Sequence, residues 1–190
     1  MTLHASDVGV RVASSLNEVR NDTGRVAFCG PYVLSAITGF PISAVEDRIR
    51  AFRGVEPDVL DTPDVGAHRK PNAPDAGRHR KAQQRIIGTH AEEVGAALAH
   101  FGYRMELKES FMDLERKKRP SLWSWMQKPR NVWVHYILAI HKGKEGHWIL
   151  IKGTKLCDTY SQGKWQFVCD GPHKGAKIME VFEVKRDQSV

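Results

Sequence analysis

The chain has 190 residues, of which 41% are hydrophobic and 27% charged, with 29 Lys and Arg against 22 Asp and Glu. This composition is ordinary for one soluble globular domain, and the longest apolar stretch, residues 132–140, is too short to cross a bilayer. The net charge of +7 permits an acidic or nucleic-acid partner, while three irregularly spaced cysteines argue against a disulfide framework and leave at least one thiol free.

The first half of the chain predicts three helices. Residues 30–38 are mostly apolar, carry Pro31 in the first turn, where its missing N–H costs nothing, and end at Gly39. Each of the other two helices begins where Ser or Thr is followed three residues later by Glu, the pattern of a capping box. They start at Ser43 and Thr89 and are expected to end near Phe52 and Gly102.

Residues 54–80 have a different character. They mix proline with Asp, Gly, His, Arg and Lys and show almost no apolar periodicity, which predicts a long polar loop. Neither flank alone has enough apolar residues for a core, so we expect this loop to interrupt a single domain of residues 1–190.

The last third of the chain predicts an antiparallel sheet, because apolar and β-branched runs alternate there with glycine-containing turns. We expect strands at residues 103–107, 132–140, 147–152, 155–160, 165–168 and 177–184, with some helix at 108–127. Helices come first and strands later, so the predicted fold class is α+β, with N-terminal helices packed on a C-terminal antiparallel sheet.

Cys29 lies directly before Gly30 and Pro31, at the expected start of the first helix. A thiol attacks only as the thiolate, and the unpaired N–H groups and dipole of a helix N-terminus favour that form. Gly30 lets the backbone turn and leaves the sulfur uncrowded. An inert, helix-packing thiol is the alternative for Cys29, and Cys157 and Cys169 are interpreted as small core residues on strands.

A base for this thiol is expected on the sheet. His147 opens a strand after a glycine-rich turn, and a hairpin across Gly153 brings Asp158 to the neighbouring strand, near the His147 end. A carboxylate there can accept the imidazole N–H and fix its tautomer. We therefore predict Cys29 as nucleophile, His147 as general base and Asp158 as the group that orients it. The residues predicted to line the substrate cleft are Gly30 and Trp148.

These segments resemble papain-like cysteine peptidases, most closely the bacteriocin-processing, C39-like branch. The resemblance is carried by Cys-Gly-Pro in residues 28–31, by a Gly-His-hydrophobic strand at 146–153, and by an Asp in 156–160. It extends over residues 20–165 outside the polar loop. It implies a papain-like fold and hydrolysis of a peptide or isopeptide bond through a thioester.

One position departs from that family. Six residues before the cysteine, the family usually has a glutamine whose side chain helps to hold the oxyanion. This chain has Thr23 at that position. Asn21 is the only nearby amide and becomes the candidate oxyanion donor, with turn formation as the alternative role. Because losing one such donor can cost on the order of a hundredfold in rate, the chain is expected to be a specialised or slow enzyme, or a fold retained for binding.

The expected partner is a protein or peptide substrate, with no membrane partner. We expect no cofactor and no metal, since a zinc site from Cys157, Cys169, His173 and a loop histidine lacks the usual ligand spacing. Nucleic-acid binding through the basic clusters at 78–81 and 116–119 is the less favoured alternative. The first residues lack the order of a secretory signal, which favours a cytoplasmic location.

Two other functions fit the same residues. One is a catalytically inactive papain-like interaction protein, viral or from a mobile element, that binds an acidic partner through its basic surface. The other is an acyl transferase or deamidase with the same Cys-His-Asp triad, because only the acceptor differs from hydrolysis.

Overall fold

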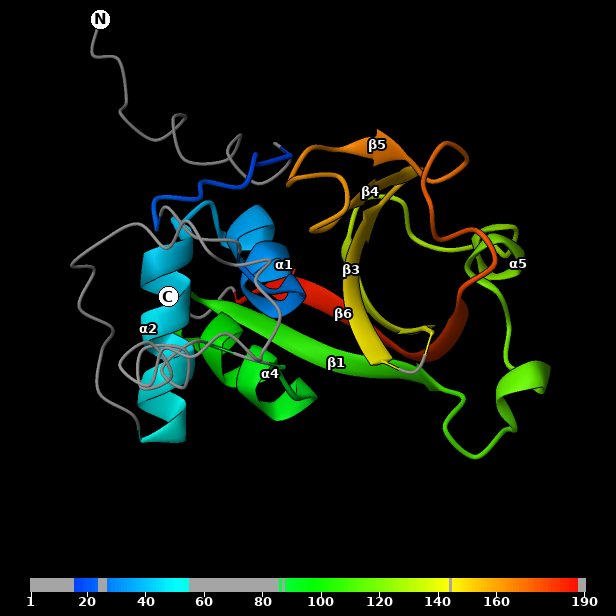
Figure 1. Cartoon of the computed structure of the whole chain (residues 1–190), viewed down its shortest axis with the longest axis horizontal. Coiled ribbons are helices and arrows are strands. Elements are labelled where there is room, and N and C mark those ends of the chain that lie inside the picture. Colours follow the sequence, from blue (N-terminus) through cyan, green and yellow to red (C-terminus); the bar gives the residue numbers. More distant parts are fainter. Residues whose placement is uncertain (1–15, 24–26, 55–85, 87, 144, 188–190) are drawn as a thin grey trace, which may run out of the picture.

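The computed structural model describes residues 16–23, 27–54, 86, 88–143 and 145–187 (Figure 1). The helices in these ranges are α1 (Cys29–Thr38), α2 (Ile42–Arg53), α4 (Ala91–His100), a 3-10 helix (Arg116–Lys118) and α5 (Leu122–Met126). The strands are β1 (Tyr103–Ser110), β2 (His135–Lys142), β3 (Glu145–Lys152), β4 (Lys155–Cys157), β5 (Gln166–Phe167) and β6 (Lys177–Arg186). The predicted polar loop lies outside the described residues, apart from Gly54.

The six strands form one antiparallel sheet in the order β1-β6-β2-β3-β4-β5. The strand that comes last in the chain, β6, lies in the interior of the sheet, between β1 and β2 (Figure 1). Ile137 on β2 accordingly pairs with Leu150 on β3 and with Phe182 on β6. The described residues thus have the predicted α+β class with an antiparallel sheet.

Both faces of the central strands are buried. On β2, Ile137 and Ala139 belong to the core that includes residues of α1, α2 and α4, whereas Leu138 and Ile140 belong to a second core that includes residues of α5. Figure 1 shows the first three helices grouped on one side of the sheet and α5 on the other. Because successive side chains of a strand point to opposite faces, the middle of β2, which is covered on both faces, is apolar at four successive positions, residues 137–140.

Helix α1 forms where it was predicted. It begins at Cys29, has Pro31 in its first turn and ends at Gly39, which adopts a left-handed conformation (φ 76°). In that conformation the Gly39 N–H donates to the carbonyl oxygen of Ser35 at 2.8 Å. The helix therefore has a defined start and a defined stop, and Cys29 is fixed at its N-terminus.

The predicted capping box at Ser43 is wrong. Helix α2 begins at Ile42, so Ser43 lies inside its first turn. The Ser43 N–H donates to Asp22 Oδ1 at 3.0 Å, and its hydroxyl bonds to Oδ2 at 2.5 Å. Glu46, the expected partner of Ser43, instead pairs with Arg50 at 2.9 Å. A carboxylate distant in sequence has taken the role that a local serine was expected to have.

The predicted capping box at Thr89 is displaced by one residue. Helix α4 has His90 at its N-cap, and the His90 N–H donates to Glu93 Oε2 at 2.7 Å. Glu93 also pairs with Arg53, the last residue of α2, at 2.5 Å. Because of this ion pair between α2 and α4, Glu93 rather than the more exposed Glu92 accepts the N–H group at the start of α4.

Several predicted strands and helices have different bounds. The helix expected within 108–127 is largely replaced by the end of β1 and by turns, with only the 3-10 helix and α5 remaining. Strand β2 begins at His135 rather than at residue 132, β5 has only two residues, and β4 ends at Cys157. Asp158 therefore lies in the turn after β4 and not on the strand itself.

The basic cluster at 116–119 is not a uniform charged surface. Arg119 is 9% exposed and donates to the carbonyl oxygens of Leu114 and Met112. Lys117 and Lys118 extend outward near Glu115. The other cluster, at 78–81, lies outside the described residues. None of the described helices has the length and apolar character needed to cross a membrane.

Candidate functional site

Cys29 is the first residue of α1, directly after Phe28 at the N-cap position. Its thiol is half-buried. Burial raises the pKa of this thiol, while the backbone N–H groups of Trp148 and Gly30 help to lower it. The N-terminus of α1 and the strand β3 therefore both favour the thiolate.

His147 and Asp158 are in direct contact, as the hairpin across Gly153 led us to expect. Gly153 has a φ of 58° in the tight turn, and Leu150 on β3 pairs with Cys157 on β4. The chain turns directly after Cys157 and brings the Asp158 carboxylate back toward His147. The distance from His147 Nε2 to Asp158 Oδ2 is 2.8 Å.

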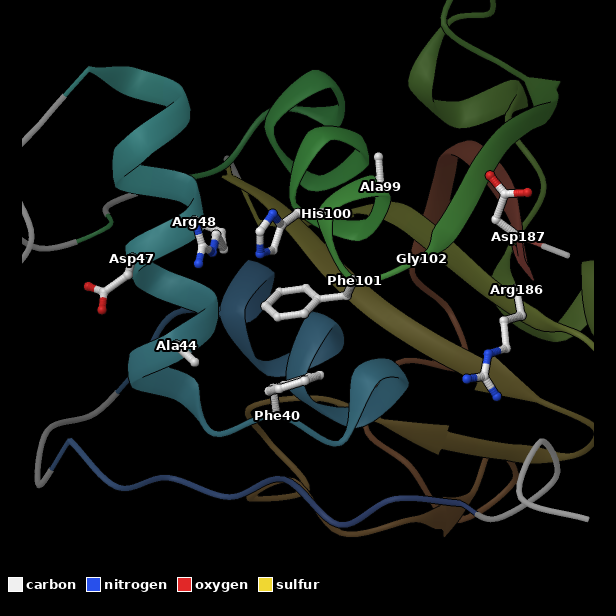
Figure 2. Close-up of a pocket in the computed structure, with 10 residues that line it drawn as sticks. All are labelled: Phe40, Ala44, Asp47, Arg48, Ala99, His100, Phe101, Gly102, Arg186 and Asp187. Atoms are coloured by element: carbon white, nitrogen blue, oxygen red, sulfur yellow. The ribbon is translucent and has the colours of Figure 1, made fainter. Parts of the chain in front are cut away.

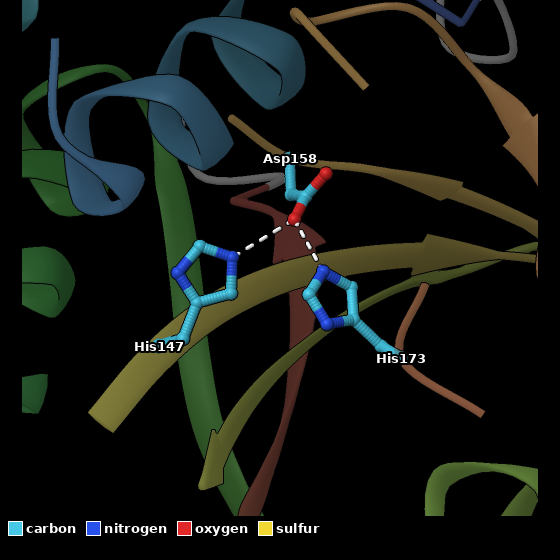
Figure 3. Close-up of side chains that lie close together, drawn as sticks. All are labelled: His147, Asp158 and His173. Atoms are coloured by element: carbon cyan, nitrogen blue, oxygen red, sulfur yellow. Dashed lines mark hydrogen bonds and ion pairs between the residues drawn. The ribbon is translucent and has the colours of Figure 1, made fainter. Parts of the chain in front are cut away.

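A second histidine contacts the same carboxylate oxygen. His173, in the turn between β5 and β6, has its Nε2 atom 2.8 Å from Asp158 Oδ2. Figure 3 shows both imidazole rings directed at this one oxygen atom. The hydrogen-bonded unit is therefore a His147–Asp158–His173 cluster, and not the predicted Cys-His-Asp triad. Cys29 is related to this cluster through its effect on the pKa of His147.

Asp158 is completely buried and uses both carboxylate oxygens. Its Oδ1 atom accepts the backbone N–H groups of Tyr160 at 3.0 Å and Ser161 at 2.9 Å, while Oδ2 accepts from the two histidines. Burial alone would raise the pKa of Asp158, but the hydrogen bonds from His147, His173 and Ser161 outweigh it and hold the pKa far below its ordinary value. The carboxylate is therefore ionised. As an anion it can only accept, so each histidine Nε2 carries the proton.

The ionisation of Cys29 and of His147 is coupled. Burial lowers the pKa of His147, but hydrogen bonds with Asp158 and Cys29 raise it to about 9. Burial raises the pKa of Cys29, but the hydrogen bond with His147 and those from the backbone lower it below its ordinary value. Both changes in pKa favour a thiolate beside an imidazolium at neutral pH. Since Nε2 of His147 faces Asp158, Nδ1 is the nitrogen left for Cys29.

Asn21, the candidate oxyanion donor, forms a turn. Its Oδ1 atom accepts the N–H of Thr23 at 3.2 Å and the Thr23 hydroxyl at 2.8 Å. Its side chain also hydrogen-bonds to Tyr32, one turn after Cys29 on α1. The turn-forming role that sequence left open is therefore present, and the oxyanion role stays a prediction.

Gly30 and Trp148, the predicted cleft residues, both contact Thr89. A Cβ atom at Gly30 would lie 2.2 Å from Thr89 Oγ1 and 2.9 Å from Thr89 Cβ. The Trp148 indole N–H donates to the Thr89 carbonyl oxygen at 2.9 Å, and its ring is 8% exposed within the helix-side core. The contacts of Trp148 are those of a core residue. Glycine at position 30 is required by the close approach of Thr89.

Replacement of Gly30 by alanine is expected to lower the free energy of unfolding by about 1–3 kcal/mol, since the new methyl group overlaps Thr89. Rotating Thr89 cannot relieve this overlap fully, because its Cβ atom is itself too close. Urea denaturation of G30A checks this. The control is G175A, because nothing lies within 4 Å of that position. Equal stability of the two variants would contradict the steric role of Thr89.

The other two cysteines differ from each other. Cys157 is fully buried on β4, and burial raises its pKa to about 12, so it stays an unreactive thiol, as predicted for a core residue. Cys169 was also predicted as a core residue, and this is wrong. It lies in the turn after β5 and is exposed, because β5 ends at Phe167.

The cluster consists of residue types that also bind metal ions. One donor atom each from His147, Asp158 and His173 lies within 4.8 Å of the others. The zinc ligand set considered from sequence is not assembled, because Cys157 is buried in the sheet core, Cys169 is exposed, and His173 is bound to Asp158.

Two hollows on the described surface lie away from Cys29. One, of about 590 Å³, is bounded by the ends of α1 and β6 and by α2 and α4 (Figure 2). The side chains of Phe40 and Phe101 stack across it with ring centroids 4.6 Å apart. The other is bordered by Glu115, Arg116, Lys117 and Lys177. Neither hollow includes a residue of the cluster.

Two residues of this site were missed by sequence reasoning. His173 was considered only as a remote zinc ligand, and Tyr160 was taken as the end of a strand. The Tyr160 ring lies edge-on to both imidazoles, with centroids 5.3 Å from His147 and 5.3 Å from His173. No spacing in the sequence links residue 173 to residue 158, so only the position of the β5–β6 turn could have revealed this contact.

Comparison with known proteins adds no relative. No protein-family profile matches the chain, and neither the curated proteins nor the solved structures contain a match.

Proposed function

We propose that this protein is a papain-like thiol hydrolase that cleaves a peptide or isopeptide bond through a thioester on Cys29. One arrangement carries the proposal: Cys29 lies at the N-terminus of α1, and His147, held at 2.8 Å by the buried Asp158, lowers the pKa of the Cys29 thiol. A structural cysteine gains nothing from such a partner, whereas a nucleophile requires one. The resemblance of the Cys-Gly-Pro and Gly-His segments to the C39-like branch supports the same reaction class.

The reaction uses the proton held between these two residues. The Cys29 thiolate attacks the substrate carbonyl carbon, and the His147 imidazolium gives its proton to the leaving nitrogen as the C–N bond breaks. Neutral His147 then takes a proton from water, the resulting hydroxide attacks the thioester, and the C–S bond breaks. Thiolate and imidazolium are restored. The N–H of Cys29, at the start of α1, is one donor for the oxyanion.

Selective alkylation tests this proposal without a known substrate. At pH 6 an ordinary thiol is almost fully protonated, so Cys29 should react with iodoacetamide at least about tenfold faster than Cys169. The exposed Cys169 serves as an internal control for access, and Cys157 should stay unlabelled. Peptide mass spectrometry of the labelled protein measures each rate. Equally slow labelling of Cys29 and Cys169 would refute the hydrolase and favour an interaction protein.

A hydrolysis assay separates cleavage from transfer. Fluorescein-labelled casein, or a mixture of fluorogenic peptides, should be cleaved by the wild-type protein and not by C29A. Release of more than one equivalent of the amine product per enzyme only when a second amine is supplied would instead indicate an acyl transferase, because thioester formation, which releases the first equivalent, is shared by both reactions.

A further inference from the structure

We propose that His173 is a positioning residue for the thiol site, which holds Asp158 ionised and fixed so that Asp158 can orient His147. This inference rests on the proposed function, since it assigns His173 a part in activating Cys29. Asp158 would then be held by two imidazoles, of which only one, His147, faces the thiol.

The contacts of Asp158 leave it no freedom to rotate. Oδ1 accepts two backbone N–H groups, from Tyr160 and Ser161, and Oδ2 accepts one N–H from each histidine. All four acceptor positions of the carboxylate are therefore used. Without His173, Oδ2 would keep one partner, and the bond to His147 would no longer be fixed from the opposite side.

His173 is held by its own turn. The N–H of Ala176 donates to the His173 carbonyl oxygen at 2.9 Å, and the N–H of Gly171 donates to the Val168 carbonyl at 3.3 Å. His173 is itself only 3% exposed, and its ring lies 5.3 Å from that of His147. A buried ring in a hydrogen-bonded turn loses little further entropy when it binds Asp158. The arrangement is thus preorganised.

The Tyr160 ring packs against the same cluster. It stands nearly perpendicular to both imidazoles, at 81° to His147 and 85° to His173. Tyr160 is itself exposed, whereas His147, Asp158 and His173 are all buried. Hydrogen bonds to a charged group are stronger when water is excluded. An ionised Asp158 stabilises the His147 imidazolium, and the imidazolium in turn stabilises the Cys29 thiolate.

The geometry favours hydrogen bonding over metal binding at this cluster. Both Nε2 atoms are directed at Asp158 Oδ2 itself, at hydrogen-bond distances of 2.8 Å (Figure 3). A bound Zn²⁺ would need the three donor atoms to converge on a point about 2.0–2.2 Å from each of them. The carboxylate oxygen already occupies the position where the two rings converge.

The test compares H173F, which keeps a ring but no donor, with H173Q, which keeps an N–H donor. We expect H173F to raise the pKa of Cys29, and therefore to lower its alkylation rate by iodoacetamide at pH 6 roughly tenfold for each pKa unit. At pH 9.5 its rate should approach that of the wild-type protein. H173Q should recover part of the lost rate at pH 6. The control is H100Q, at an exposed histidine on α4.

A second measurement separates failure of this inference from failure of the proposed function. In ¹⁵N–¹H NMR spectra, the Nε2 protons of both histidines should be observed together in the wild-type protein, and in H173F that of His147 should move. A Cys29 that reacts slowly while both protons are present would refute the hydrolase but leave the network intact.

The inference about His173 is overturned by either of two results. One is a Cys29 that reacts rapidly in the wild-type protein and has the same pH profile in H173F, with no change in the His147 proton. The other is a loss of Cys29 reactivity in wild-type protein treated with EDTA that Zn²⁺ alone restores, because the cluster would then be a metal site.

Discussion

Replacement of Asp158 by asparagine should be the most damaging conservative change in the described part of the chain. The side chain keeps its shape but loses the charge that four hydrogen bonds now satisfy. The amide group of the asparagine must also direct its own N–H groups toward N–H donors that now bond to the carboxylate. Removing one member of a buried charged network costs about 3–5 kcal/mol of unfolding free energy. Urea denaturation at pH 7 measures this loss.

The effect of D158N should depend on pH in a defined direction. The folded-state pKa of Asp158 lies below its unfolded value of about 3.9, because of the hydrogen bonds that favour the anion. The stabilisation is therefore present above about pH 4 and is lost as the pH falls toward the folded-state pKa. The difference in stability between wild-type protein and D158N should be greatest near pH 5 and shrink below pH 4. It should also shrink as the pH rises above about 6.5, because the hydrogen bond with Asp158 helps to raise the pKa of His147 to about 9.

A matched control is D113N, since Asp113 is exposed in a turn. It should change the free energy of unfolding by less than about 0.5 kcal/mol. If D158N were as harmless as D113N, or if its effect grew below pH 4, the ionised state of Asp158 would be wrong.

Replacement of His147 by alanine should convert Cys29 from the thiolate to the protonated thiol at neutral pH. In the wild-type protein the hydrogen bond with His147 helps to outweigh burial, which by itself raises the pKa of this thiol. Without the imidazole, only the backbone N–H groups counteract the rise that burial causes in the pKa of Cys29. We expect the pKa of Cys29 to rise in H147A, and each unit of that rise lowers the thiolate fraction at neutral pH about tenfold.

Thiolate absorbance at 240 nm measures this directly, as the difference between each protein and its C29S counterpart. The subtraction removes the contributions of Cys157, Cys169 and the tyrosines. H141A is a suitable control, because His141 bonds to Arg119 and not to the cluster. Unchanged titration of Cys29 in H147A would show that the thiol is set by the helix N-terminus alone.

The sequence predicted two local features on which the site depends, the start of α1 and the contact between His147 and Asp158. The start of α1 follows from Pro31 and Gly39, whose restricted or permissive φ angles fix the two ends of the helix. The contact between His147 and Asp158 follows from the short β3–β4 hairpin, because a tight turn at Gly153 sets which residues lie opposite each other.

Helix starts were less predictable than these turns. The serine pattern at residue 43 was wrong, because Asp22 accepts the Ser43 N–H, and the threonine pattern at residue 89 was displaced by one residue, because Glu93 accepts the His90 N–H. Asp22 lies 21 residues from Ser43 in the chain. A local pattern cannot reveal such a competitor.

By itself, the sequence determined the α+β class, the helix that carries Cys29 and the hairpin that joins His147 to Asp158, because each depends on residues only a few positions apart. The tertiary structure decided that β6 inserts between β1 and β2 and that His173 reaches the buried Asp158. Pairing across the sheet and packing in the two cores set these positions. Such long-range contacts depend on the whole chain and leave no periodic pattern in it.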